Sequence, residues 1–277
     1  MTLKERILPI MATPYPAQGT AGELRIGIDV GGTWIKGALI DLANGAPAGT
    51  VRRLQTPSCG SVDAVADTVE QMVAELEAES HRAADRAVGI AIPSIVQRGV
   101  ARSAANMDGS WIGLDVQRYL QSRLGRPVRV VNDADAAGLA ETQYGAGAAN
   151  QGVVLVLTLG TGIGSALIVD GTLVPNFELG HLEIGGIKAE SRASAVVREN
   201  EGLDWVQYAD RLQRYLSHVE FLFSPDLIVI GGGISACSHE YLPRLSLRTQ
   251  VIAARLENSA GVVGAALQAS TANARLK

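Results

Sequence analysis

Apolar residues fall into two recurring patterns along this chain, which are short β-branched runs and longer stretches with helical spacing. The helical stretches would each bury one apolar stripe, and the longest of them, 203–223, places Trp205, Leu212 and Val219 on one face. The short runs predict strands at 24–30, 34–40, 49–55, 86–92, 127–131, 153–159, 163–169, 227–230 and 249–253. The stretches predict helices at 62–80, 115–124, 133–144, 191–199, 203–223 and 261–272. This alternation predicts an α/β protein.

A glycine turn between two apolar strands occurs twice. The segment 160–168 repeats the segment 32–40 with Gly, Thr, Ile, Ala, Leu and Ile in register. Two related hairpins predict two related α/β domains around mixed sheets, with a cleft between them. We expect a mobile tail at 1–23, an N-terminal domain at 24–134 that also takes in the C-terminal helix at about 261–277, and a C-terminal domain at 135–260.

Composition excludes several classes of function. The 277 residues are 47% hydrophobic with a formal net charge of −4, which argues against a general nucleic-acid binder. Cys59 and Cys237 fit neither a disulfide framework nor a zinc cluster, so a reducing cytoplasm is the expected compartment. No apolar run approaches the roughly 20 residues of a membrane span. Prolines interrupt the N-terminal apolar cluster, so we expect no signal peptide and no membrane partner.

The first glycine hairpin carries the residue types of a phosphate and magnesium site. Gly31 and Gly32 expose backbone N–H groups at a tight reversal, and Thr33 and Lys36 add a hydroxyl and a cation. Asp29, at the end of the preceding strand, is placed to hold Mg²⁺ through water. Taken alone, the stretch is equally consistent with a plain hairpin in which Asp29 caps the turn and Lys36 is a surface cation.

A second carboxylate follows a strand directly. Asn132 and Asp133 come immediately after 127–131, so Asp133 would lie at the edge of the expected cleft. A carboxylate in that position could take the proton from a substrate hydroxyl as a general base. Spacing alone leaves open a second role, in which Asp133 only caps the helix that follows it.

These motifs resemble the ROK family of bacterial sugar kinases, within the sugar-kinase, hsp70 and actin superfamily. The resemblance covers nearly all of 24–267 and rests on five motifs in the family's order: DVGGTxxK (29–36), Asn132-Asp133, LGTGIG (159–164), ELGH (178–181) and IGGG (230–233). It implies two ribonuclease H-like domains of the actin-like ATPase type. It also implies phosphoryl transfer to the 6-hydroxyl of glucose, with Asp133 as the general base.

The resemblance further assigns residues to the two substrates. Short amide and carboxylate side chains with one histidine would contact the sugar hydroxyls: Asn106, Asn132, Asp133, Glu178, His181 and Glu190. The donor phosphates would lie across both hairpins and the IGGG turn, at Gly31, Gly32, Thr33, Lys36, Thr161, Gly162, Gly232 and Gly233. Asp108 competes with Asn106 in the same loop. His181 could instead be a structural hydrogen bonder, and the IGGG turn a plain connection from strand to helix.

One segment departs from the common family pattern. Most members follow ELGH with a cysteine cluster that holds zinc, whereas 185–199 has no Cys, so we expect no structural zinc. This departure, the compact length and the segment 224–235 resemble actinobacterial members that use inorganic polyphosphate, including forms that also use ATP and mannose. Five arginines could contact the distal part of such a donor, but a solvated surface is their more ordinary role, so none is assigned: Arg192, Arg198, Arg211, Arg214 and Arg244.

Three alternatives remain open from the sequence. An ATP-only hexose or acylhexosamine kinase would share every motif above. A sugar-responsive repressor would need a DNA-binding module, for which the roughly 23 residues before the first strand are too few. The Asn132-Asp133 pair argues against a sugar-binding or actin-like assembly protein without catalysis. The expected partners are glucose, with mannose in some similar proteins, and polyphosphate or ATP, and the chain would be a monomer or homodimer.

Overall fold

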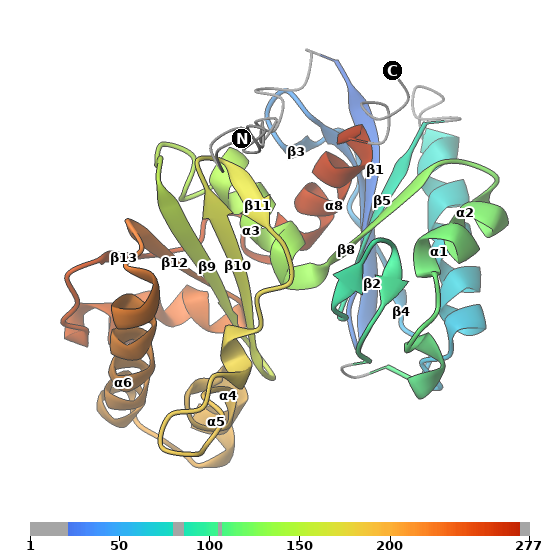
Figure 1. The fold of residues 1–277 in the computed structure, drawn as a ribbon. Coiled ribbons are helices and arrows are strands. Elements are labelled where there is room, and N and C mark those ends of the chain that lie inside the picture. The colour runs from blue at the N-terminus through green and yellow to red at the C-terminus, as the bar shows by residue number, and fades with distance from the viewer. Residues whose placement is uncertain (1–21, 80–85, 105–106, 272–277) are drawn as a thin grey trace, which may run out of the picture.

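The fold was analysed in a computed structural model that describes residues 22–79, 86–104 and 107–271. Two β-sheets lie side by side in Figure 1, with two helices, α3 (Asp133–Gln143) and α8 (Ala260–Ser270), between them. Two mixed sheets with helices confirm the predicted α/β class. The predicted tail at 1–23 falls almost entirely outside the described residues, as does Asn106.

The first sheet has the strand order β3-β2-β1-β5-β8, and β4 also pairs with β2. Its first two strands form the antiparallel hairpin predicted from the glycine turn, whereas β5 and β8 continue the sheet in parallel with β1. The strands are β1 (Leu24–Val30), β2 (Trp34–Asp41), β3 (Ala46–Pro47), β4 (Arg52–Gln55), β5 (Val88–Ile92) and β8 (Val128–Asn132). A separate ladder joins β6 (Val96–Gln97) to β7 (Val100–Ala101).

Apart from β4, the second sheet repeats this arrangement, with the order β11-β10-β9-β12-β13. Its antiparallel hairpin β9–β10 corresponds to β1–β2, and β12 and β13 extend it in parallel. The strands are β9 (Val153–Leu159), β10 (Ile163–Val169), β11 (Thr172–Val174), β12 (Leu227–Gly231) and β13 (Gln250–Ala253). The shared order explains the sequence repeat, because both hairpins start the same kind of sheet.

The helices fall into two outer layers and one central pair. Helices α1 (Val62–Glu79) and α2 (Val116–Leu124) cover the first sheet, and α6 (Trp205–Phe223) covers the second. The central helices cross over, because α3 follows β8 but packs on β9 and β10, whereas α8 packs on β1 and β5. The short helices are η3 (Gly109–Trp111), η4 (Leu179–His181), α4 (Glu190–Ala193), α5 (Ala195–Asn200), η5 (Gly233–Cys237), α7 (Ser238–Tyr241), η6 (Leu242–Arg244) and η7 (Glu257–Ser259).

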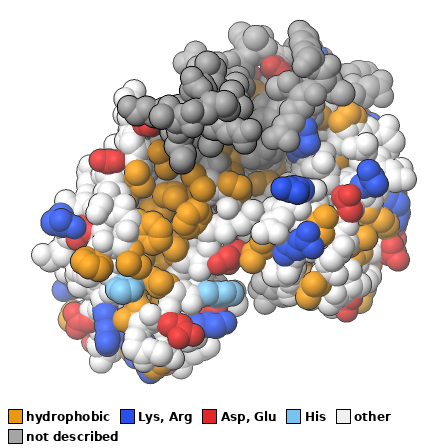
Figure 2. All heavy atoms as spheres, in the orientation of Figure 1, with side chains coloured by type: hydrophobic (Ala, Val, Ile, Leu, Met, Phe, Trp, Pro, Cys, Tyr) orange, Lys and Arg blue, Asp and Glu red, His pale blue; other side chains and the backbone are white. Residues whose placement is uncertain are grey.

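The two central helices approach each other so closely that one glycine is required at their contact. A Cβ atom on Gly264 of α8 would lie 1.8 Å from the carbonyl oxygen of Ala136 in α3, far inside van der Waals contact. The contact holds the start of α3 in place between the two sheets. In Figure 2 the surface is hollowed between the two halves of the molecule, below this pair of helices.

One predicted helix is broken in the structure. The stretch 191–199 forms α4 and α5, which are separated by Ser194 in an extended conformation. Two tertiary hydrogen bonds explain the break, because the Tyr208 hydroxyl donates to the Ala193 carbonyl at 3.0 Å and the Val196 amide donates to the Gly160 carbonyl at 3.1 Å. A helical pattern in the sequence gives no sign of such partners.

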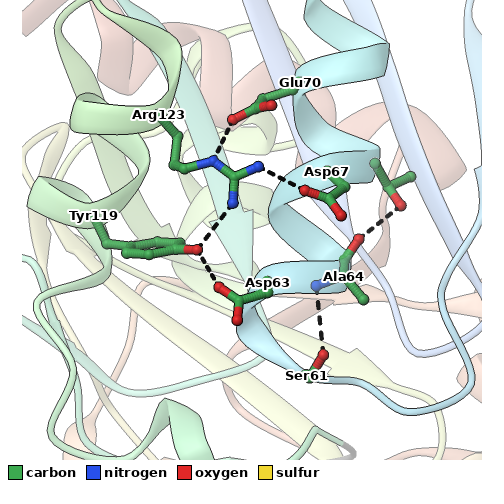
Figure 3. A network of polar contacts seen from close by, with 8 residues as sticks. Ser61, Asp63, Ala64, Asp67, Glu70, Tyr119 and Arg123 are labelled. Carbon is green, nitrogen blue, oxygen red and sulfur yellow. Dashed lines mark hydrogen bonds and ion pairs between the residues drawn. The ribbon is translucent and has the colours of Figure 1, made fainter.

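The outer layers of the two sheets are held by different interactions. On the first, Arg123 of α2 donates to Glu70 and Asp67 of α1, each at 2.6 Å, and the Tyr119 hydroxyl donates to Asp63 (Figure 3). On the second, α6 is anchored by aromatic rings, with Trp205, Tyr208 and Tyr241 in mutual contact at centroid distances of 5.9 to 6.3 Å. None of the described helices is long and apolar enough to cross a membrane.

Candidate active site

A cavity of about 540 Å³ opens between the two sheets and collects residues from distant parts of the chain. Its walls come from both glycine hairpins, the segment after β5, the start of α3, and the region from η4 to α4. Most of the predicted site residues line it, namely Gly31, Gly32, Asn132, Asp133, Thr161, Gly162, Glu178, His181, Glu190 and Gly232. Residues separated by more than a hundred positions therefore face one space.

Four other predicted residues lie beside this cavity and do not line it. Asp29 and Lys36 face each other across the first hairpin, with 4.0 Å between Oδ2 and Nζ. Thr33 is exposed on the turn, and its carbonyl accepts a hydrogen bond from the Thr56 amide. Gly233 begins η5 next to Gly232. Asn106 lies outside the described residues, so its predicted sugar contact stays a prediction.

The helix cap at the start of α3 separates the roles of Asn132 and Asp133. Asn132 is the N-cap residue, since its Oδ1 accepts from the Asp135 amide at 3.0 Å, and its Nδ2 donates to the Ser94 carbonyl at 3.1 Å. Asp133 is therefore not the cap. Its Oδ1 accepts from the Ala134 amide at 2.8 Å, and no hydrogen bond to its Oδ2 occurs among the described residues. The cap leaves Asp133 facing the cavity with one oxygen available.

The surroundings of Asp133 suit a proton acceptor near neutral pH. Burial is the main cause that raises the pKa of Asp133 to about 7, and the negative charges of Asp29 and Glu178 raise it further. The Ala134 amide opposes this shift by stabilising the ionised form. A carboxylate with such a pKa is a stronger base than an exposed aspartate but is still ionised in part at neutral pH.

Three polar side chains, Glu178, His181 and Glu190, form the part of the cavity wall beside the second hairpin. His181 Nε2 lies 3.3 Å from Glu190 Oε1, and a Cβ atom on Gly162 would lie 2.7 Å from Glu190 Oε2. Burial raises the pKa of Glu178, with Glu190 adding to the shift and His181 opposing it. The carboxylates and the imidazole offer acceptors and a donor to the hydroxyl groups of a sugar.

Ser165, which was not among the predicted site residues, fixes the position of Glu178. Ser165 is 1% exposed, and its hydroxyl donates to the Phe177 carbonyl at 2.6 Å and accepts from the Leu179 amide at 2.9 Å. It therefore holds the backbone on both sides of Glu178. The repeat contained a signal, because Ser165 stands where the first hairpin has Gly37.

Asn176, also missed, joins the two sides of the cavity. Its Oδ1 accepts from the Val96 amide at 2.8 Å and its Nδ2 donates to the Val96 carbonyl at 2.9 Å. Its own amide donates to Asp135 Oδ2 at 2.9 Å. Asn176 has a φ of 63°, a conformation that Asn tolerates better than most residues. These bonds link the β6–β7 ladder to the segment that carries Glu178.

Each glycine hairpin is held by a contact from another segment. The Thr56 hydroxyl donates to the Gly31 carbonyl at 2.7 Å, which secures the first turn. In the second, Gly232 packs against the end of β9, where a Cβ atom would lie 2.3 Å from the Leu159 carbonyl oxygen. Gly232 also has a φ of +81°, so both space and conformation require glycine there. The two turns are thus fixed and present backbone groups to the cavity.

Asp29 is the candidate for holding a metal ion. Burial raises its pKa while Lys36 opposes the shift, and its charge in turn acts on Asp133. A Cβ atom on Gly261 of α8 would lie 2.7 Å from Asp29 Cγ, so a small residue leaves room for this carboxylate. The described part of the chain holds no group of three or more His, Cys, Asp or Glu side chains placed for a metal ion. A single carboxylate fits Mg²⁺, which usually keeps several waters and shares substrate phosphates.

Comparisons with known proteins agree with this geometry. A family model of the ROK family matches residues 25–195. The chain is 46% identical over 242 residues to a polyphosphate glucokinase of Mycobacterium tuberculosis, covering 87% of this chain and 89% of that one. It is 42% identical over 267 residues to the polyphosphate glucokinase of Mycobacterium leprae, covering 96% and 80%.

Two crystal structures are similar in fold over most of the chain. An inorganic polyphosphate/ATP-glucomannokinase from Arthrobacter sp. strain KM matches with a TM-score of 0.84 and 57% identity, covering 89% of this chain and 98% of that one. A ROK family glucokinase from Streptomyces griseus, in complex with glucose and AMPPNP, matches with a TM-score of 0.74 and 25% identity, covering 88% and 98%. The chain belongs to the ROK family.

Proposed function

We propose that this protein is a polyphosphate glucokinase, which transfers a phosphoryl group from inorganic polyphosphate, ATP or both to the 6-hydroxyl of glucose. The observation that carries the proposal is the cavity itself, where Asp133, with a pKa of about 7, shares one space with both glycine hairpins. The similarity to two mycobacterial polyphosphate glucokinases supports the choice of sugar and donor. Mannose enters as a second sugar through the similarity to the glucomannokinase.

In this mechanism Asp133 takes the proton from the sugar hydroxyl as that oxygen attacks the terminal phosphorus. The terminal phosphoanhydride bond breaks, and the donor leaves shortened by one phosphate, as a shorter polyphosphate or as ADP. Phosphoryl transfer requires mainly alignment and charge neutralisation, so one base and fixed phosphate contacts are sufficient. Asn132 holds the start of α3 and so aims Asp133, through its bonds to Asp135 and Ser94. Glu178, His181 and Glu190 would bind the other hydroxyls, because they line the same cavity.

The donor would lie across the two hairpins. Gly32, Thr161 and Gly162 offer backbone or hydroxyl donors at the cavity wall, beside Gly31, whose own amide donates to the Trp34 carbonyl at 3.0 Å. Thr33, Lys36 and Gly233 stand next to them. Asp29 would hold Mg²⁺ through water, and the ion would neutralise the donor phosphates when bound. We also propose that 24–134 with the C-terminal helix, and 135–260, act as two lobes that close on the substrates, because water left between them would compete with the sugar.

A donor-by-sugar activity matrix on the purified protein tests this proposal. Initial rates would be measured with long-chain polyphosphate and with ATP, each against glucose, mannose and an acylhexosamine. We expect glucose 6-phosphate as the product with polyphosphate. Turnover with ATP only would favour the alternative of an ATP-dependent hexose or acylhexosamine kinase. Absence of turnover with every pair would contradict the kinase proposal.

A further inference from the structure

A second cavity lies next to the candidate active site, behind the short helix α4. Glu190 of α4 lines the active-site cavity, whereas Arg192 of the same helix lines this second one. It has a volume of about 320 Å³ and is lined by the loop before α4, by α4 and by α6, and the two helices pack together. It is large enough for a small polar group and is separate from the space in front of Asp133.

Three arginines line this cavity, namely Arg192, Arg211 and Arg214. Arg211 is neutralised in part, because its Nη2 lies 2.6 Å from Glu201 Oε2. Within the described residues neither Arg192 nor Arg214 has a carboxylate at ion-pair distance or a side-chain hydrogen bond. Two positive charges therefore line one hollow without an ion pair at contact distance, and Glu201, whose pKa both Arg211 and Arg192 lower, is shared between two of the three arginines. An excess of positive charge of this kind attracts an anion.

A buried hydroxyl in the same cavity lacks a partner. Tyr215 is 1% exposed and lines the cavity, yet its hydroxyl has no hydrogen-bond partner in the described part of the chain. A buried polar group without a partner is costly, so such a group usually marks the place of a water or a ligand. Phosphate oxygens accept hydrogen bonds from both a hydroxyl and guanidinium groups, which makes a phosphate the anion that matches these donors.

The segment beside this cavity also touches the second glycine hairpin. The Val196 amide donates to the Gly160 carbonyl at 3.1 Å, and Glu190 Oε2 lies next to Gly162. A chain of phosphates whose reacting end is held at Thr161 and Gly162 could therefore continue along this segment to Arg192. A polyphosphate chain is much longer than the triphosphate of a nucleoside triphosphate, so it needs cations beyond its reacting end.

We propose that the cavity formed around Arg192, Arg211, Arg214 and Tyr215 binds phosphate groups of a polyphosphate chain distal to the one that is transferred. This inference rests on the proposed function, because it concerns the donor of that reaction. The free phosphate ion shares the same chemistry, and the experiment below separates the two. The cavity determines affinity for long donors and takes no part in the chemical step.

The test is a variant that removes the two unpaired charges, Arg192→Gln with Arg214→Gln. We expect its KM for long-chain polyphosphate to rise about tenfold, as for the loss of two partly exposed charge-assisted contacts. The KM values for ATP, tripolyphosphate and glucose should stay unchanged, because these ligands do not reach the cavity. The dependence of the polyphosphate KM on salt should also become weaker. The matched control is Arg118→Gln with Arg248→Gln, whose side chains are 87% and 78% exposed and lie elsewhere.

Several outcomes would overturn the inference. An unchanged polyphosphate KM, or an equal rise with ATP and tripolyphosphate, would exclude a distal-chain site. Calorimetry that shows orthophosphate binding as tightly as the long chain, and lost in the variant, would assign the cavity to free phosphate instead. Tyr215→Phe is the second variant if the double variant is unstable, and a polyphosphate KM that it leaves unchanged would count against the site. Wild-type protein that uses ATP but not polyphosphate would reject the proposed donor before any variant is made.

Discussion

The two hairpins that face the active-site cavity share a backbone but differ in charge. In the first hairpin, Val30 and Ile35 form the residue pair next to the turn, and the pair before it sets Asp29 opposite Lys36. The same place in the second hairpin holds Thr158 opposite Gly164. One hairpin therefore offers a carboxylate and a cation, and the other offers only a hydroxyl and backbone groups. The two sheets share a strand order but differ in charge where their hairpins face the cavity.

The crossing of the central helices explains this difference. Helix α3 reaches the second hairpin, where a Cβ atom on Gly164 would lie 2.5 Å from Thr158 Oγ1 and 2.8 Å from Ala134 Cβ. Any larger residue there would displace the first turn of α3, which carries Asp133. Helix α8 reaches the first hairpin with Gly261, so the charged residues of that hairpin keep their space. Asp133, the proposed base, is supplied on one side, and the pair of Asp29 and Lys36 on the other.

The largest effect on the difference between the two hairpins is expected from removing the proposed base, Asp133. We expect Asp133→Asn to lower kcat by about 10²–10⁴-fold with either donor, because the amide keeps the size of the side chain but cannot accept the proton. The glucose KM should change little. Steady-state kinetics measure both quantities, with Glu183→Gln as a control that alters an exposed carboxylate outside the cavity. Full turnover in Asp133→Asn would remove Asp133 from the mechanism.

The pH profile provides a second and smaller effect. Because the pKa of Asp133 is raised to about 7, chiefly by burial, its carboxyl is protonated below that pH and cannot act as a base. We expect kcat/KM to fall about tenfold per pH unit below about pH 7. A rate that stays flat down to about pH 5 would contradict this assignment, since that is close to the pKa of an ordinary aspartate.

The same shift affects stability with a definite sign. Between its ordinary pKa and about 7, Asp133 is ionised in the unfolded chain but protonated in the folded one, so stability falls as pH rises through this range. Asp133→Asn removes this contribution. Its free energy of unfolding should therefore exceed that of the wild type above pH 7 and match it in acid, as chemical denaturation at several pH values would measure. Asp135, whose pKa burial also raises to about 7, is raised further by the charge of Asp133. Its own shift therefore becomes smaller in Asp133→Asn, which adds to the same difference above pH 7.

Much of the site could be predicted because its signals are local. Each hairpin is recognised by an apolar strand that ends in glycines. The repeat of 32–40 in 160–168 predicts that the two hairpins have similar structures, and the shared strand order confirms it. Asp133 was predicted from its place after a strand. Spacing alone could not decide between a cap and a base, and the structure removes the cap alternative because Asn132 fills that role.

The remaining parts depend on partners that lie far away in the sequence. Asn176 forms hydrogen bonds to Val96, 80 positions away. Ser165 of strand β10 holds the backbone on both sides of Glu178, which lies just before η4. The break at Ser194 likewise depends on Tyr208 and Gly160. No pattern of hydrophobic and polar positions contains such contacts, because it describes one element at a time. The cavity behind α4 was also not predicted, although its arginines were named, because only folding brings them together.

The asymmetry of the hairpins can be tested with one methyl group. We expect Gly164→Ala to destabilise the protein by about 1–3 kcal/mol, the usual range for overpacking a filled core. It should also lower kcat, because α3 and Asp133 must move. Gly160→Ala in the same hairpin is the matched control for stability, since a Cβ atom there meets nothing within 4 Å. Thermal unfolding of the two variants provides the comparison, and equal stability would mean that α3 does not limit position 164.

The smallest expected effect concerns the outer layers. The α1–α2 layer is joined by exposed ion pairs around Arg123, whereas α6 is anchored by the rings of Trp205, Tyr208 and Tyr241 (Figure 3). Salt screens exposed charges, whereas the ring cluster carries no charge that salt could screen. High salt should therefore speed amide hydrogen exchange in α1 and α2 slightly and change it less in α6, which is anchored by its rings in addition to the ion pair Arg211–Glu201.

Arg123→Gln should remove the salt response around Asp67 and Glu70, whereas the end of α1 keeps its ion pairs with Arg52 and Arg126. A response that persists around Asp67 and Glu70 in this variant would place its origin elsewhere. Because exposed pairs contribute little, the change in exchange should be small and limited to the first sheet's outer layer.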